Sequence, residues 1–189
     1  MTDSRTILGS WNDATGGSEQ SVAVLGLDAA ALSRNWRRCG LSADFLARYY
    51  SYYFPYREKA TDRISRDTAE NTISYILNEL IENTAKYSDA AETWVEVVVR
   101  LRENDVLFQV SNHVTEKRAG EFTRIVSDLL GGNAEELYVA QLEKNTGSSG
   151  LGYLTMINDY GVSLGFMVKK NADDVFTVSV QASMKWKEA

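Results

Sequence analysis

One uninterrupted helical pattern, over residues 67–88, most constrains how this chain can fold. Large aliphatic side chains recur there at steps of three and four residues, at Ile73, Ile76, Leu77, Leu80 and Ile81. Neither proline nor glycine interrupts the segment. The pattern predicts one long amphipathic helix whose apolar side must be buried against another layer of the protein.

Segments with strand-like patterns lie on both sides of this helix. They cover residues 22–27, 93–102, 106–111, 164–168 and 175–184. These segments are rich in β-branched and aromatic residues, which are enriched in strands. A short polar turn joins the second and third of them, and this arrangement predicts a β-hairpin.

Further helices are predicted between and before these strands. One begins at Ser42 as N-cap and is stopped by Pro55, and others cover residues 121–130, 134–142 and 151–160. Residues 1–20 are polar and predict a loose arm. The order of elements predicts an α+β protein, a two-layer sandwich with helices on one face of a mixed, mainly antiparallel sheet.

The composition excludes several classes of protein. The net charge of −6 argues against binding to a phosphate backbone, so nucleic acid is not an expected partner. No apolar run is long enough to cross a bilayer, so no membrane partner is expected. A single cysteine, Cys39, and a single histidine, His113, rule out the usual disulfide frameworks and zinc centres. These features fit the cytoplasm, and we expect Cys39 to be a packing residue and His113 to be structural.

Three polar residues of the long helix suit the chemistry of a magnesium nucleotide. Glu79, Asn83 and Lys86 stand three and four residues apart, which places them on one helical face. The amide oxygen of Asn83 can ligate a hard cation, Lys86 can face phosphate, and Glu79 can orient or deprotonate a nucleophile. The alternative interpretation is an amphipathic helix whose exposed face is merely polar, and the trio taken alone favours this alternative.

A glycine- and serine-rich loop, NTGSSGLG at residues 145–152, runs directly into the predicted helix at 151–160. Backbone N–H groups of such a loop can turn toward an anion, and the helix N-terminus adds partial positive charge. Short glycine-rich loops are more often simple connections. It is the combination with the polar helix face that favours a phosphate site.

The two motifs together resemble those of a known superfamily. ELIENTAKYS looks like the N box of the GHKL ATPases, and SSGLGYLTMINDYG looks like their second glycine box with the helix that follows. The resemblance covers roughly residues 69–182 and implies the Bergerat ATP-binding fold. Within the superfamily, the chain is most similar to stand-alone bacterial regulators of partner-switching modules, the anti-sigma-factor-type and SiaB-like serine kinases that act on STAS-domain proteins.

The resemblance also implies roles for individual residues. It makes Asn83 the Mg²⁺ ligand, Glu79 the general base and Lys86 a phosphate-side group. The phosphate-binding loop would comprise Gly147, Ser149, Gly150, Leu151 and Gly152. Most members carry an Asp-x-Gly box whose aspartate accepts a hydrogen bond from the adenine amino group. Here Asn112 occupies the equivalent region, and its side-chain oxygen can accept the same bond.

Two functions follow as hypotheses, with ATP and Mg²⁺ as the expected cofactors. The first is a serine/threonine kinase that phosphorylates a STAS-domain partner. The second is a nucleotide-sensing or catalytically inactive module that sequesters its partner. An autophosphorylating histidine kinase is disfavoured, because His113 follows the N box instead of preceding the catalytic domain.

The chain divides in this interpretation into an N-terminal arm and helical extension, residues 1–66, and a GHKL-like ATP-binding domain, residues 67–189. The extension holds the aromatic stretch ARYYSYYFPY. Tyrosine is enriched at interfaces, so this stretch suggests a partner surface or a homodimer surface. The alternative is a helix that simply packs on its own domain, because aromatic residues mostly serve cores.

Overall fold

A computed structural model describes residues 5–13, 19–54, 65–88, 94–132, 151–172 and 174–185. The strands are β1 (Arg5–Gly9), β2 (Glu19–Asp28), β3 (Trp94–Arg102), β4 (Asp105–Val114), β5 (Ser163–Ala172) and β6 (Val175–Lys185). The helices are α1 (Ala29–Arg34), α2 (Arg37–Ser51), α3 (Arg66–Tyr87), α4 (Glu116–Gly131) and α6 (Leu151–Tyr160).

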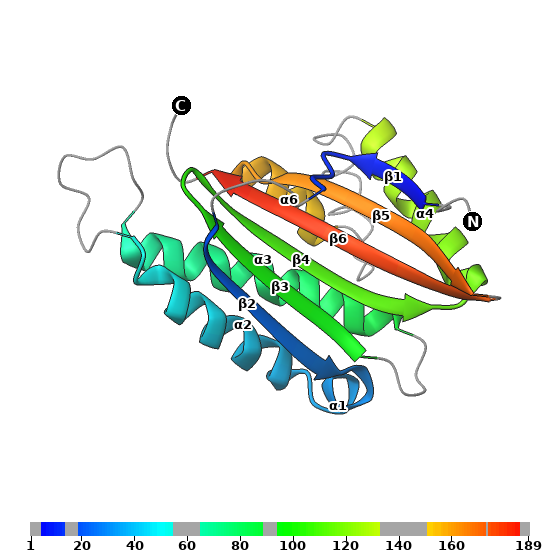
Figure 1. Ribbon diagram of the computed structural model, residues 1–189, viewed down its shortest axis with the longest axis horizontal. Helices are drawn as coiled ribbons and strands as arrows, with labels where there is room; N and C mark the ends of the chain where they lie inside the picture. The colour runs from blue at the N-terminus through cyan, green and yellow to red at the C-terminus, as the bar shows by residue number, and fades with distance from the viewer. Residues whose placement is uncertain are drawn as a thin grey trace.

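The strands form one sheet in the order β1-β5-β6-β4-β3-β2, and the helices cover one of its faces (Figure 1). The predicted α+β two-layer sandwich is therefore confirmed. The expected mixture of parallel and antiparallel strands is corrected, because every neighbouring pair among the described strands is antiparallel. β1 and β2 form the two edges of the sheet.

Helix α3 is the central element of the helical layer, as its sequence pattern predicts. Ser65 caps its first turn, because the Ser65 side chain accepts a hydrogen bond from the backbone N–H of Thr68. The predicted apolar side is fully buried in the main core, with Ile73, Ile76, Leu77, Leu80 and Ile81 all at 0% exposure. Burial of five such side chains contributes on the order of 10 kcal/mol before entropic costs, at about 2 kcal/mol each.

The helix expected to begin at Ser42 begins earlier, so this prediction is wrong. A short helix, α1, is capped by Asp28, whose Oδ1 accepts from the N–H of Ala31 at 2.7 Å. Helix α2 then starts at Arg37 without a side-chain cap. Its first turn is held by packing instead, because Cys39 is fully buried in the core. Burial therefore places the start of α2 five residues before the best capping residue.

The loose arm expected over residues 1–20 is also corrected. β1 pairs with β5, and β2 already begins at Glu19. Between them, residues 10–13 run across the sheet face opposite the helices. Gln181 holds this crossing segment there: its Oε1 accepts from Asn12 N–H at 2.9 Å, and its Nε2 donates to Asn12 O at 3.0 Å. Gly165 lies beneath, where a Cβ would come within 2.6 Å of the Trp11 backbone.

The boundaries around the hairpin differ from the prediction in a way that matters for the site. β4 extends to Val114, beyond the expected end at residue 111, so Asn112 lies on a strand and not on a loop. α4 begins at Glu116 instead of 121. The helix at 151–160 is confirmed as α6, whereas the helix predicted for 134–142 lies outside the described residues.

Residues from both sides of the proposed boundary at residue 66 share one core. Leu46 and Tyr50 of α2 belong to the same buried cluster as Ile73 of α3 and Val97 of β3. The helices before this boundary, α1 and α2, pack directly on the elements that follow it, and the division of the chain at residue 66 stays a prediction.

Candidate functional site

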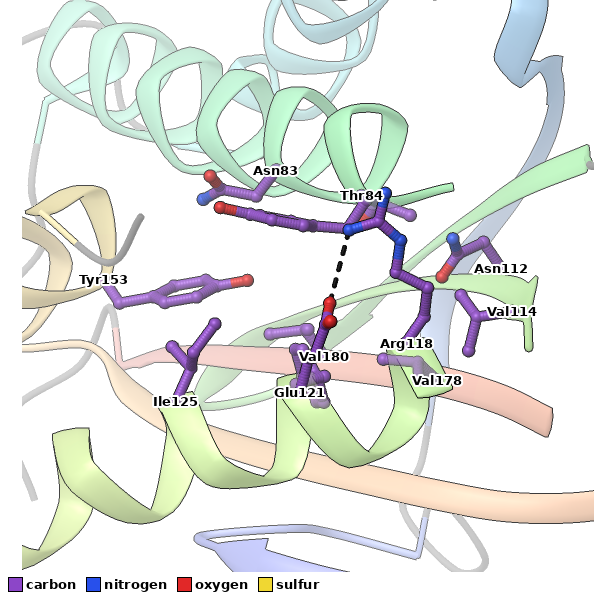
Figure 2. Close-up of a pocket in the computed structure, with 12 residues that line it drawn as sticks. Asn83, Thr84, Asn112, Val114, Arg118, Glu121, Ile125, Tyr153, Val178 and Val180 are labelled. Carbon is purple, nitrogen blue, oxygen red and sulfur yellow. Dashed lines mark hydrogen bonds and ion pairs between the residues drawn. The ribbon is translucent and has the colours of Figure 1, made fainter. Parts of the chain in front are cut away.

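A cavity lies between the C-terminal half of α3, the adjoining ends of β4 and β6, and the helices α4 and α6 (Figure 2). Its lining residues are Asn83, Thr84, Tyr87, Asn112, Val114, Arg118, Glu121, Phe122, Ile125, Tyr153, Val178 and Val180. The walls are thus mainly apolar or aromatic, and a few polar groups are set among them. Such a combination is typical of small-molecule sites.

Asn112 supplies a fixed hydrogen-bond acceptor to this cavity. The residue is only 5% exposed, and its Nδ2 donates to Ser88 Oγ at 2.8 Å. Ser88 is held in turn, because its hydroxyl donates to the carbonyl of Thr84 at 2.8 Å. The Asn112 Oδ1 accepts no hydrogen bond from the described residues, so it remains able to accept one from a ligand. The structure thus places Asn112 in the wall of the cavity, and its predicted role as a base-binding acceptor stays a prediction.

Asn83 contributes the second amide, on the α3 side of the cavity (Figure 2). Its Nδ2 is buried and has no hydrogen-bond partner among the described residues. An unsatisfied buried amide is rare and calls for an explanation. A ligand that accepts a hydrogen bond from this Nδ2 would provide one, because the amide nitrogen is a donor. The sequence-predicted residues Asn83 and Asn112 therefore meet in one cavity.

Glu79 lies one helical turn before Asn83 and does not line the cavity. Its carboxylate contacts the first turn of α6, where a Cβ at Gly152 would overlap it. Only glycine leaves room for the carboxylate as it stands. The two sequence motifs thus meet physically at the contact between Glu79 and Gly152.

Burial raises the pKa of the Glu79 carboxyl, and the neighbouring Glu82 raises it further. Glu82 is itself engaged, since its Oε1 accepts from Asn78 Nδ2 at 3.1 Å. A carboxylate with a raised pKa is a better proton acceptor than an exposed one.

Lys86 is not brought to the cavity. Its side chain is exposed, and its Nζ lies 5.8 Å from the centre of the Tyr87 ring. The cavity side of α3 passes through Asn83, Thr84 and Tyr87 instead, which turns Lys86 away. Of the predicted phosphate loop, Leu151 and Gly152 begin α6, whereas Gly147, Ser149 and Gly150 lie outside the described residues.

Two charged residues that the sequence pattern does not single out flank the cavity on α4. Arg118 and Glu121 form an ion pair, with 3.4 Å between Nη1 and Oε2, and both are about half-exposed (Figure 2). The cavity itself encloses only about 50 Å³. Ligand sites usually measure about 300–1,000 Å³. The cavity as it stands in this structure is therefore smaller than a site for a nucleotide.

Two tyrosines that line the cavity were also not predicted from the sequence. Tyr153 of α6 is buried at the end of the cavity, and burial raises its pKa. Burial raises the pKa of Tyr87 as well, while nearby Arg118 opposes that shift. Tyr87 follows Asn83 by four residues, so helical spacing alone could have placed it beside the amide.

The remaining single residues agree with the sequence interpretation. Cys39 is fully buried, and burial raises the pKa of its thiol to about 11, which makes it an unreactive packing residue. His113 is exposed near the end of β4. Among the described helices, none combines the length and apolarity that a bilayer crossing requires.

Comparison with known proteins identifies a structural neighbour. No protein-family model matches the sequence, and no curated protein sequence matches it. The fold is similar to a chain in the crystal structure of the SiaB-SiaC complex from Pseudomonas aeruginosa, with a TM-score of 0.57 and 16% sequence identity. The similarity covers 84% of this chain and 99% of that chain. At this identity the likeness concerns the fold.

Proposed function

We propose that this protein is a cytoplasmic ATP-binding regulator of a partner-switching module, of the GHKL type, and that it phosphorylates a serine or threonine of a STAS-domain partner. The observation that carries the proposal is the meeting of Asn83 and Asn112 in one mainly apolar cavity. Each amide has bonding capacity that no described residue uses.

The cavity suits a flat purine with an exocyclic amino group. Val114, Val178 and Val180 provide an apolar surface for the base, and Asn112 Oδ1 provides the acceptor for its amino group. Because Ser88 holds the nitrogen of Asn112, the oxygen is oriented before the ligand arrives. Preorganisation of this kind lowers the entropic cost of binding.

Asn83 is the residue that would hold Mg²⁺. The described residues contain no cluster of three or more His, Cys, Asp or Glu side chains that could hold a metal ion. Magnesium keeps several waters and is bound largely through substrate phosphates and one or two protein oxygens, usually of carboxylates, and in this proposal the amide oxygen of Asn83 takes that place. When bound, the ion would neutralise charge on the transferred phosphoryl group.

Glu79 would act on the partner's hydroxyl group. Its raised pKa and its position one turn from Asn83 suit a residue that accepts a proton from an incoming serine or threonine. The half-buried contact with Gly152 keeps the carboxylate against α6. In this proposal, the backbone at the start of α6 also faces the phosphates, as helix N-termini do.

The fold similarity supports a protein partner. The neighbouring structure is a complex of SiaB with SiaC. We infer that this chain corresponds to SiaB and that its partner is a SiaC-like, STAS-domain protein. The alternative to a different partner protein is a homodimer formed through the aromatic residues of α2.

A second function is favoured by two specific observations. Lys86 points away from the cavity, and the Arg118–Glu121 pair narrows it. Both features fit a module that senses nucleotide or sequesters its partner without phosphoryl transfer.

Isothermal titration with Mg-ATP tests the proposal. We expect binding by the wild type and loss of binding in Asn83→Ala, with Lys86→Ala as the matched control on the same helix. Absence of binding by the wild type would remove ATP from the proposal. Incubation with a STAS-domain protein encoded nearby, followed by mass spectrometry, then separates the two functions. A complex with bound ATP but without phosphoserine or phosphothreonine supports sequestration.

A further inference from the structure

Helix α2 is apolar on two sides, and only one of them is covered. Its inner side is buried against α3 and the sheet, through Cys39, Ala43, Leu46, Ala47 and Tyr50. Its outer side exposes Leu41, Phe45 and Tyr49, and Tyr52 and Tyr53 are exposed directly after the helix, with Phe45 at 66% and Tyr52 at 64% exposure. Contiguous exposed apolar and aromatic side chains often mark an interaction site. The outer residues, here called the aromatic face, therefore indicate a binding surface.

Strand β2 runs beside this helix as an open edge of the sheet (Figure 1). Among the described strands, only β3 pairs with it. Its central sequence, VAVLGL at residues 22–27, contains no charge and no proline, and Val24 is 64% exposed. Edge strands are usually protected by lysine, proline or a bulge. In the central part of β2 such protection is missing, and its backbone is available to another strand.

A groove joins the edge strand to the aromatic face. One hollow is lined by Phe45, Arg48, Tyr49, Tyr52 and Tyr53. A second hollow lies between β2, α1, α2 and Trp94, and it shares Phe45 with the first. The five exposed aromatic rings of the two hollows leave roughly 550 Å² uncovered, at about 200 Å² per ring. This area is at the upper end for patches on monomers, and one side of a standard interface covers about 800 Å².

The charged residues that line the groove are two arginines and one aspartate, Asp28, so the groove is net positive although the whole chain is negative. Arg38 lines one hollow and Arg48 the other, and neither forms an ion pair with a described residue. The nearby acids are already engaged: Asp28 caps α1, and Asp44 accepts from Ser74 Oγ at 2.6 Å. Neither arginine therefore has an anionic partner among the described residues.

We propose that this groove binds an extended, acidic segment of a partner protein, which adds to the sheet as a strand beside β2. Apolar side chains of the segment fill the two hollows, and its carboxylates face Arg38 and Arg48. A second copy of this chain fits less well, because a twofold contact would place the same unpaired arginines against each other. The inference rests on the proposed function only in requiring a protein partner, and it does not require ATP.

The test uses the full-length, isotope-labelled protein and two synthetic nine-residue peptides. Both peptides alternate valine or phenylalanine with a charged residue, which is glutamate in one and lysine in the other. We expect the glutamate peptide to bind at least tenfold more tightly at low salt, to shift the amide resonances of residues 22–27, and to slow hydrogen exchange along that edge. Higher salt should weaken it.

Three variants locate the interaction. The double reversal Arg38→Glu with Arg48→Glu should invert the peptide preference, and Phe45→Ser should weaken both peptides. Each of these side chains is exposed, so the fold should be retained. Arg37→Glu, on the same helix but outside both hollows, is the matched control and should change affinity less than threefold.

Several results would overturn the inference. They are equal binding of the two peptides, amide shifts confined to another surface, or the absence of binding of either peptide at about 1 mM, a concentration that would detect even weak binding. A dimer in sedimentation velocity that Phe45→Ser dissociates would assign the face to a second copy. Titration of ATP into the same samples keeps the proposals separate, since loss of ATP binding alone leaves the groove assignment standing.

Discussion

The hydrogen bond between Asn112 and Ser88 gives the sharpest test of the site geometry. In Ser88→Ala the Nδ2 of Asn112, in a residue that is 5% exposed, loses its only acceptor among the described residues. Leaving a buried donor unsatisfied costs about 1–3 kcal/mol, so we expect the free energy of unfolding to fall by about that amount. The same substitution also removes the bond from Ser88 to the carbonyl of Thr84.

A double-mutant cycle with Asn112→Ala separates these two contributions. The bond to Thr84 is lost whether or not residue 112 is changed, so it cancels, and the coupling of Ser88 with Asn112 should be about 1 kcal/mol. Urea denaturation followed by circular dichroism measures the free energy of unfolding of each variant, provided that its dependence on urea concentration, the m value, is the same in all of them. The exposed Ser33→Ala variant serves as a control, with an expected change within about 0.5 kcal/mol. A coupling below about 0.3 kcal/mol would refute the claim that Ser88 orients the amide.

Other predictions address the carboxylate and the glycines. Glu82→Gln removes a charge that raises the pKa of Glu79, so it should lower that pKa. Because the deprotonated carboxylate is the proposed base, the acid limb of the pH profile of the phosphotransfer rate should move to lower pH. Gly152→Ala should displace the Glu79 carboxylate and slow phosphotransfer at saturating ATP, which steady-state kinetics measures. Gly165→Ala should lower the free energy of unfolding by about 1–3 kcal/mol, because its Cβ would meet backbone atoms. Gly120 lies inside α4 with open space around it, so Gly120→Ala should raise the free energy of unfolding by about 0.5–1 kcal/mol. Urea denaturation measures the change for both glycine variants.

The parts of the fold that local sequence encodes were predictable. The apolar spacing of α3 and the β-branched runs of β3 and β6 specify their own conformations and buried sides. β1 could not be predicted in this way, because its five residues are ordered by pairing with β5, far along the chain. The start of α2 was misplaced for a similar reason: burial of Cys39 outweighs the capping preference of Ser42.

The candidate site was predictable to the extent that it lies on those local patterns. Asn83 and Asn112 reach the same cavity as predicted, although the pattern could not show that Ser88 fixes the amide of Asn112. Helical spacing predicted that Lys86 and Asn83 share one face of α3. The side of α3 that lines the cavity is set by the positions of β4 and α4, and Lys86 is not on that side. Arg118 was missed because the helix was predicted to begin at residue 121, whereas α4 begins at Glu116 and includes Arg118.

The position of α3 constrains how a nucleotide and a partner could influence each other. One side of α3 lines the cavity through Asn83 and Tyr87, and another packs on α2, whose outer side is the aromatic face. Its core side chains are fully buried, and close-packed helices do not shift on one side without repacking on the other. If the proposed nucleotide widens the cavity, it acts on the wall that α3 forms, and α3 packs on α2. Any such coupling must be reciprocal: a segment bound beside β2 that strengthens ATP binding by some factor must itself bind more tightly, by the same factor, when ATP is present.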